Sequence, residues 1–324
     1  MSARQAAHRE RGSRSIGLDA VAAGGVIALV AAFAIGSALR PERKSDPVHR
    51  RATRKARDGA AILGASVLMD SAMEHFRGGF HNRAMVLAPA TAAASIAASL
   101  AEPRPDRTGR LPRLGHALSF AVGAAGLGFH FYNVTKRPGG LSWNNLFYAA
   151  PLGAPGALAI SGLLGLTSEA LSIAPVDGNR TGNEALAWSL PEAGRGLALA
   201  TGGSLLVTAA EAGLLHFRGA FHNPAMWLPV TVPPATGLFL IGEAANPTDS
   251  GREVTRWAAR GVAVLGVVGT AFHVWGVHRN MGGWHNWRQT SLAGPPTPAP
   301  ISFTGLAMAG LAALDALGSE ERSS

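Results

Sequence analysis

The chain of 324 residues contains no cysteine, and charged residues make up only 15% of it. The absence of cysteine excludes disulfide bonds, thiolate metal sites and cysteine nucleophiles. Any bound metal would therefore depend on histidine, carboxylate or methionine ligands. The scarcity of charge, together with 47% hydrophobic residues and 41 glycines, is more typical of helices packed in lipid than of a soluble enzyme.

Several motifs of well-known enzyme classes are also absent. The sequence has no Walker loop, no glycine-rich dinucleotide fingerprint and no nucleophile elbow, and it lacks the HxxxH boxes of membrane desaturases. The segment "GAAGLG" at 123–128 lies inside an apolar run with no strand before it, so we do not expect it to bind phosphate. The function must therefore be inferred from the apolar runs and the histidines.

Apolar runs of about membrane-spanning length recur nine times. They cover residues 16–39, 59–76, 81–100, 114–133, 146–167, 197–217, 222–242, 256–277 and 299–316. Each is close to the ~20 residues with which a helix crosses ~30 Å of hydrocarbon. The first run is too long for a signal-peptide core and no clear cleavage site follows it, so we expect a retained helix. The sequence therefore predicts an all-α integral membrane protein with about nine transmembrane helices.

Two stretches of the sequence each occur twice in similar form. "EHFRGGFHNRAM" at 74–85 matches "LHFRGAFHNPAM" at 215–226, and "GAAGLGFHFYNVTKRPGG" at 123–140 matches "GVVGTAFHVWGVHRNMGG" at 266–283. Each unit holds four of the predicted spans, and an even number of spans makes the two units parallel repeats. We predict an N-terminal arm, first helix and basic loop (1–58), a first repeat (59–167), a linker (168–195), a second repeat (196–316) and a tail (317–324).

This topology gathers six histidines at one membrane face, because in each repeat they end the first span, begin the second or lie late in the third. They are His75, His81 and His130 in the first repeat, and His216, His222 and His273 in the second. Acids accompany them. Asp70 corresponds to Glu211, and Glu74 follows Asp70 by one helical turn, so the two face the same way.

These residue types point to a metal or haem centre. Imidazole binds zinc, copper, iron and haem iron, and a nearby carboxylate ligates the metal or orients the imidazole. The six histidines with Asp70, Glu74 and Glu211 are therefore predicted metal ligands, either of a di-metal centre (Fe, Cu or Zn) or of a haem b in each repeat. In the haem alternative, His75 pairs with His130 and His216 with His273, and Arg77 and Arg218 bind the propionates.

A structural alternative explains part of the same motif. Gly78 and Gly219 are expected to take the left-handed conformation that ends a helix, and Asn82 and Asn223 to start the next one. The arginines would then extend to lipid headgroups. This alternative accounts for glycine, asparagine and arginine but does not require histidine on both sides of the turn.

The net charge of +9 is unevenly placed, since the segment 40–58 alone holds eight Lys and Arg residues. Because this segment lies between two apolar runs, we interpret it as a cytoplasmic segment facing lipid headgroups, and we expect no nucleic-acid partner. The face that carries it collects about 18 of the 29 basic residues under the positive-inside rule. The histidines are therefore predicted on the extracytoplasmic side of an inner or plasma membrane.

Three functions remain open at this point. The leading hypothesis is a membrane redox component that exchanges electrons with a partner protein or a quinone. The second is an ion- or proton-coupled transporter or channel that uses Asp70, Glu74, Glu211 and the histidines. The third is a non-catalytic membrane anchor subunit.

Overall fold

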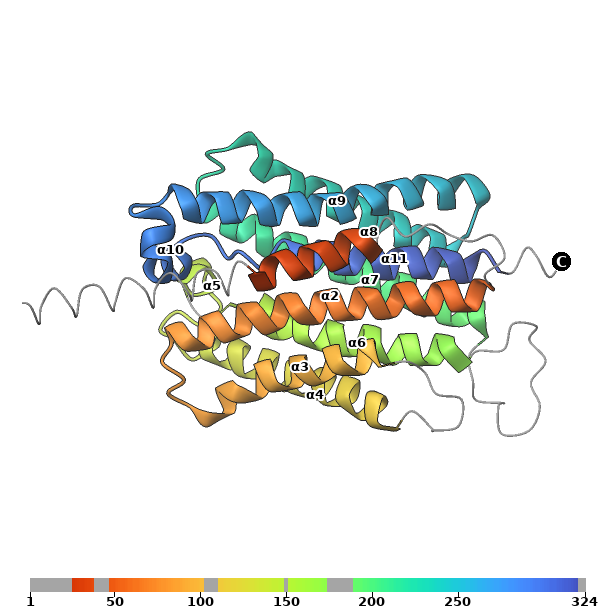
Figure 1. The fold of residues 1–324 in the computed structure, drawn as a ribbon, viewed down its shortest axis with the longest axis horizontal. Coiled ribbons are helices and arrows are strands. Elements are labelled where there is room, and N and C mark those ends of the chain that lie inside the picture. Colours follow the sequence, from red (N-terminus) through yellow and green to blue (C-terminus); the bar gives the residue numbers. More distant parts are fainter. Residues whose placement is uncertain (1–24, 38–46, 102–109, 149–150, 174–188, 320–324) are drawn as a thin grey trace, which may run out of the picture.

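A computed structural model describes residues 25–37, 47–101, 110–148, 151–173 and 189–319 of the chain. These residues are helical with short turns, and no strand occurs among them. Most of the predicted N-terminal arm, the middle of the predicted linker and the end of the predicted tail lie outside the described residues. The helices run side by side along the long axis of the molecule (Figure 1).

The chain builds two halves with the same order of elements, except that, among the described residues, the second half has one more short 3-10 helix, η4. The first half consists of α2 (Val48–Arg77), η1 (Arg83–Val86), α3 (Leu87–Leu100), α4 (Arg110–Thr135), α5 (Trp143–Tyr148) and α6 (Gly153–Ile173). The second half consists of α7 (Leu190–Arg218), η3 (Pro224–Trp227), α8 (Leu228–Ala245), α9 (Asp249–Arg279), η4 (Gly283–Asn286), α10 (Trp287–Ala293) and α11 (Ile301–Leu317). A further helix, Gly25–Ser37, precedes both halves.

Six helical segments of the described chain are long and apolar enough to cross a membrane. They are Arg83–Leu100, Arg110–Thr135, Gly153–Ser172, Leu190–Arg218, Pro224–Ala245 and Asp249–Arg279. Each coincides with one of the predicted spans, and together they support an all-α membrane protein. The predicted spans 16–39, 59–76 and 299–316 are not among the six. Their helices are Gly25–Ser37, the partly basic α2, and α11, which has 17 residues.

Helix α11 forms the centre of the fold, and every one of its residues is buried. It packs along α2, α7 and α9. The helix Gly25–Ser37 covers one side of this centre, where Ala34 joins Ile62 of α2 and Met308 of α11 in one apolar cluster. The corresponding helix of the first half, α6, packs along α4, α2 and α7 but keeps partly exposed residues along its length.

Glycine lets the third and fourth helices of each half approach closely. A methyl group on Gly123 would lie 2.7 Å from Ala159 Cα and 2.8 Å from the Pro155 carbonyl oxygen. A methyl group on Gly266 would lie 2.8 Å from the Pro300 carbonyl oxygen. Real side chains almost never come so near, so only glycine fits at these crossings.

Helix α2 begins at Val48, ahead of the apolar run that starts at residue 59, so much of the predicted basic loop is helical. Its basic side chains bind neighbouring helices. Lys55 Nζ lies 2.7 Å from one oxygen of Asp315 on α11, and Arg256 Nη1 of α9 lies 2.8 Å from the other. The Asp315 side chain is only 4% exposed. This buried triad ties α2, α9 and α11 together at the end opposite to α5 and α10.

Replacing Asp315 by alanine tests the weight of this triad. Asp315→Ala leaves two cations without their shared carboxylate, and removing one member of a buried ion pair costs about 3–5 kcal/mol. Asp249→Ala is the control, because it breaks an ion pair with Arg252 in which the carboxylate is 87% exposed, so we expect a smaller loss than for the buried Asp315. The measurement is the free energy of unfolding in detergent micelles. Equal losses for the two variants would contradict the role of Asp315.

Candidate functional site

The two copies of the twelve-residue motif fold into the same helix–turn–helix unit. Helices α2 and α7 end at Arg77 and Arg218, and the residues that then take positive φ angles are Gly79 (69°), Phe80 (46°), Ala220 (57°) and Phe221 (46°). The expectation that Gly78 and Gly219 take this conformation is wrong, since their φ angles are −77° and −82°. The chain continues as a helix C-terminus through those glycines and reverses one residue later.

Asparagine starts the next helical segment in both copies, as the structural alternative predicted. The Asn82 side chain accepts a hydrogen bond from the Ala84 backbone N–H at 2.9 Å, and Asn223 accepts one from Ala225 at 2.9 Å. These bonds satisfy backbone donors that the first turn of a helix leaves unpaired. The asparagines are therefore explained by the turn itself.

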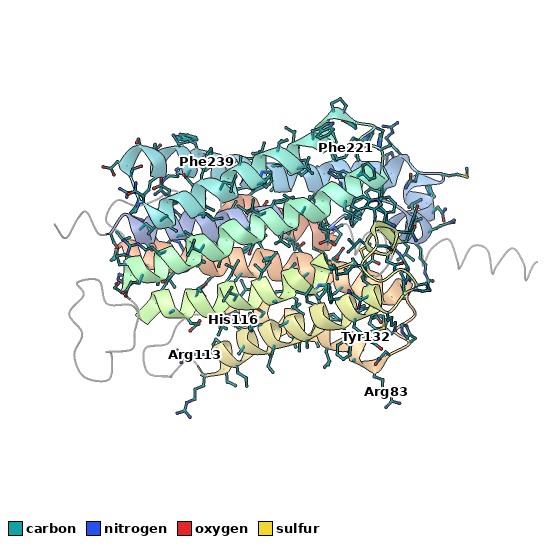
Figure 2. The ribbon with its side chains drawn as sticks, turned by 180° about the vertical axis from the view of Figure 1, so that it is seen from behind. Arg83, Arg113, His116, Tyr132, Phe221 and Phe239 are labelled. Carbon is teal, nitrogen blue, oxygen red and sulfur yellow. The ribbon has the colours of Figure 1, made fainter. Side chains whose placement is uncertain are left out.

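The six histidines lie at the end of the bundle that carries α5 and α10 (Figure 1). His75 and His216 stand in the last turns of α2 and α7, and His81 and His222 in the turns that follow. His130 and His273 lie late in α4 and α9. Tyr132 and Phe221 are labelled at this end in Figure 2, whereas Arg113 lies at the other.

The Nδ1 atom of each of these imidazoles is hydrogen-bonded to a backbone carbonyl oxygen, and the bonding partners correspond between the halves. The pairs are His75 with Met85 (2.6 Å), His216 with Met226 (2.8 Å), His81 with Gly78 (3.1 Å), His222 with Gly219 (3.0 Å), His130 with Pro151 (2.5 Å) and His273 with Pro296 (2.7 Å). Because a carbonyl only accepts, Nδ1 carries the proton and donates it. In the neutral ring, Nε2 then keeps its lone pair.

The structure brings four of the six histidines together in two pairs. The His216 and His273 ring centroids lie 6.5 Å apart at an interplanar angle of 64°. His75 and His130 are near enough to interact electrostatically. His81 and His222 are exposed and bond back to their own turns. Among the described residues, no group of three or more histidines and carboxylates has the arrangement of a metal site.

The predicted acids lie together between the two halves. Asp70 of α2 interacts electrostatically with Glu74 on its own helix and with Glu211, its counterpart on α7. Glu211 accepts a hydrogen bond from the backbone N–H of Gly153, the first residue of α6. Its carboxylate occupies the space that a side chain at Gly153 would take. A helix N-terminus favours negative charge, so Glu211 links α7 to the start of α6.

Arg77 and Arg218 both reach into the opposite half. Arg77 pairs with Glu74 at 2.8 Å and donates a second hydrogen bond to the carbonyl of Leu292 in α10. The Arg218 guanidinium lies over the rings of Phe147 and Tyr148 in α5, at 5.1 and 5.9 Å. Both guanidinium groups are thus engaged by protein.

The phenylalanines of the motif also contact the opposite half. Phe217 of α7 packs edge-on against Trp143 of α5 at 6.0 Å, and Phe76 of α2 lies under the Arg288 guanidinium of α10 at 5.4 Å. Each Phe-Arg pair therefore docks on the short helix of the other half. This contact was not predicted from the sequence, although the aromatic residues of "WNNLFY" at 143–148 were a visible signal of it.

Comparisons of the chain with models of protein families, with curated proteins and with solved structures find no match.

The cross-half contact predicts that Arg218 matters for stability. Arg218→Ala removes two cation–π contacts of an exposed arginine, and such contacts contribute about 0.5–1 kcal/mol each. Arg83→Ala is the control, because Arg83 is an exposed arginine in η1 at the same end of the bundle. Thermal unfolding in detergent should show a lower Tm for Arg218→Ala and little change for Arg83→Ala. An equal Tm for both variants would show that the contact contributes nothing.

Proposed function

We propose that the chain spans the membrane nine times, as one N-terminal helix followed by two parallel four-helix repeats within 59–167 and 196–316. The matched motif turns, histidine bonds and glycine crossings support the repeats. Helix α11 lies among other helices and not against lipid, so it needs neither high hydropathy nor extra length. Its 17 residues correspond to about 26 Å at 1.5 Å per residue, close to the hydrocarbon thickness of ~30 Å.

We also propose that the histidine end is extracytoplasmic. The opposite end carries the basic first turns of α2, including Lys55 and Arg57, and the Arg256 side chain of α9. Basic residues concentrate on the cytoplasmic side of membrane proteins. That distribution supports an inner- or plasma-membrane protein with its histidines facing outward.

We infer that the histidine pairs hold a haem b and that the protein is a membrane redox component. The His216–His273 pair is the observation that carries this proposal. Two imidazoles that ligate one metal from opposite sides, at ~2 Å per bond, place their ring centroids about 6 Å apart. The observed 6.5 Å is close to that separation. Because Nδ1 is fixed to a carbonyl in each ring, Nε2 is the atom left to ligate.

Haem fits these pairs better than a bare metal ion. A haem supplies the four equatorial ligands itself and needs only two from the protein. A zinc site takes three or four protein ligands, and the described residues form no such group. A haem near the membrane surface would exchange electrons with a partner protein or a quinone, and it would be bound between His216 and His273 and between His75 and His130.

The absorption spectrum of the detergent-purified protein tests this proposal. We expect a Soret band and a stoichiometry of two haems, one for each histidine pair. His216→Ala and His273→Ala should each lose half of the haem, because a pair with one imidazole retains a single axial ligand. His222→Ala is the control, since His222 is exposed and lies outside the pairs. The absence of a Soret band, or full haem content in both ligand variants, would contradict the proposal.

A second candidate function, ion or proton coupling in a transporter or channel, is favoured by the acids. Ionisable groups at membrane depth are costly and usually mark function. Asp70, Glu74 and Glu211 lie close together, and their charges repel one another when all are ionised. Two acids at matching positions of the halves provide a place where protons or cations bind and leave.

Flux measurements separate this function from the redox one. In proteovesicles with an imposed pH gradient, the transporter hypothesis predicts proton or cation flux that Asp70→Asn with Glu211→Gln abolishes. Asp249→Asn, which changes an exposed acid at the opposite end, should leave the flux intact. Flux that survives the double variant would exclude these acids from the pathway. A protein with neither haem nor flux would be best described by the anchor-subunit hypothesis.

A further inference from the structure

A second polar site lies inside the first half, away from the predicted ligands. His116 of α4 is fully buried, and its Nδ1 lies 2.9 Å from the Ser95 hydroxyl of α3. Its Nε2 atom is buried with no hydrogen-bond partner among the described residues. The ring occupies the space that a side chain at Gly165 of α6 would fill. Figure 2 shows His116 on the stretch of α4 between Arg113 and Tyr132.

Two further polar groups without partners come from neighbouring helices. Arg57 of α2 donates one hydrogen bond to the Ala98 carbonyl at 3.3 Å, but its Nε atom is buried and has no partner in the described chain. Ser99 follows Ala98 and lies one turn beyond Ser95 on α3, so it shares the face that meets His116. Its hydroxyl is also buried and without a described partner. Arg57 is the charged group that acts electrostatically on His116.

The second half shows that the fold does not need these polar groups. At the positions that match Arg57, Ser99 and His116, it has Ala198, Leu240 and Ala259, all of them fully buried. Leu240 packs toward Gly310, as His116 packs against Gly165. Apolar side chains therefore replace all three polar groups in the second half, although the nearby Thr201 also has a buried hydroxyl without a described partner.

An unpaired buried polar group costs about 1–3 kcal/mol, and native proteins pair nearly all of them. Three such groups at one place in one half, replaced by apolar residues in the other, indicate that something binds there. Among the described residues, no carboxylate pairs with Arg57. Arg57 is partly buried, and a charge with restricted access to solvent is stabilised by a negative partner.

We propose that Arg57, Ser99 and His116 bind a small inorganic anion such as chloride between α2, α3 and α4. The arginine Nε–H and the serine hydroxyl donate directly. His116 donates from Nε2–H when the Ser95 hydroxyl donates to Nδ1, so each of the three groups can donate a hydrogen bond to one anion. An uncharged water would leave the Arg57 charge uncompensated.

Chloride-dependent stability tests the site. Thermal unfolding of the full-length protein in detergent is followed while sodium chloride replaces sodium gluconate at constant ionic strength. A ligand that binds only the native state raises Tm in a saturable manner, so we expect a rise of a few degrees with chloride. Arg113→Ala, which changes an exposed arginine near the same end of α4, should keep the full rise.

The decisive variant replaces the three polar residues of the site. Arg57→Ala, Ser99→Leu and His116→Ala combined should yield a folded protein whose Tm no longer responds to chloride. If this combination does not fold, Ser99→Ala alone should move the midpoint of the chloride response to a higher concentration. A wild-type protein without a chloride response would overturn the proposal in favour of bridging water. A response unchanged by the combined variant, or by Ser99→Ala when that variant is the one measured, would overturn it as well.

Discussion

The hydrogen bond from imidazole Nδ1 to a backbone carbonyl is the constraint on which one end of this molecule is built. Six histidines make it, and each links a helix to the turn or the helix start beside it. Carbonyl groups near a helix end have no partner within the helix, and in a membrane they cannot rely on water. The imidazole satisfies such a group through Nδ1 and keeps Nε2 available for a second partner. Structure and candidate chemistry therefore depend on the same bond.

The two halves share this device but are not equivalent. The Phe-Arg pair of each half packs on the short helix of the other half, α10 or α5. The helix Gly25–Ser37 covers only the α11 side, which leaves α6 partly exposed. At the positions that match Arg57, Ser99 and His116, the second half has the buried apolar residues Ala198, Leu240 and Ala259. The two halves thus share their motif turns and carry different side chains at matching positions.

Much of the helix arrangement was predictable, because apolar runs of spanning length and repeated motifs can be read directly from the sequence. The histidine cluster at one end followed from counting spans, and the asparagine caps followed from the turn chemistry. The start of α2 was not predictable from hydropathy, because its first turns are basic and Lys55 pairs with Asp315, which is 260 residues away in the sequence. Glu211 on the N-terminus of α6 and Arg218 on α5 also depend on contacts between halves, which no local pattern records. His116 looked like a single polar residue in an apolar run.

The central claim is that the paired histidines are held by Nδ1 and present Nε2 to one another. Nuclear magnetic resonance of the detergent-solubilised protein, with isotope-labelled histidine ring nitrogens, measures this directly. We expect His216 and His273 to be neutral rings with the proton on Nδ1, and removal of any cofactor to leave that tautomer unchanged. Rings protonated on Nε2, or signals that show rapid exchange between the two tautomers, would contradict the account.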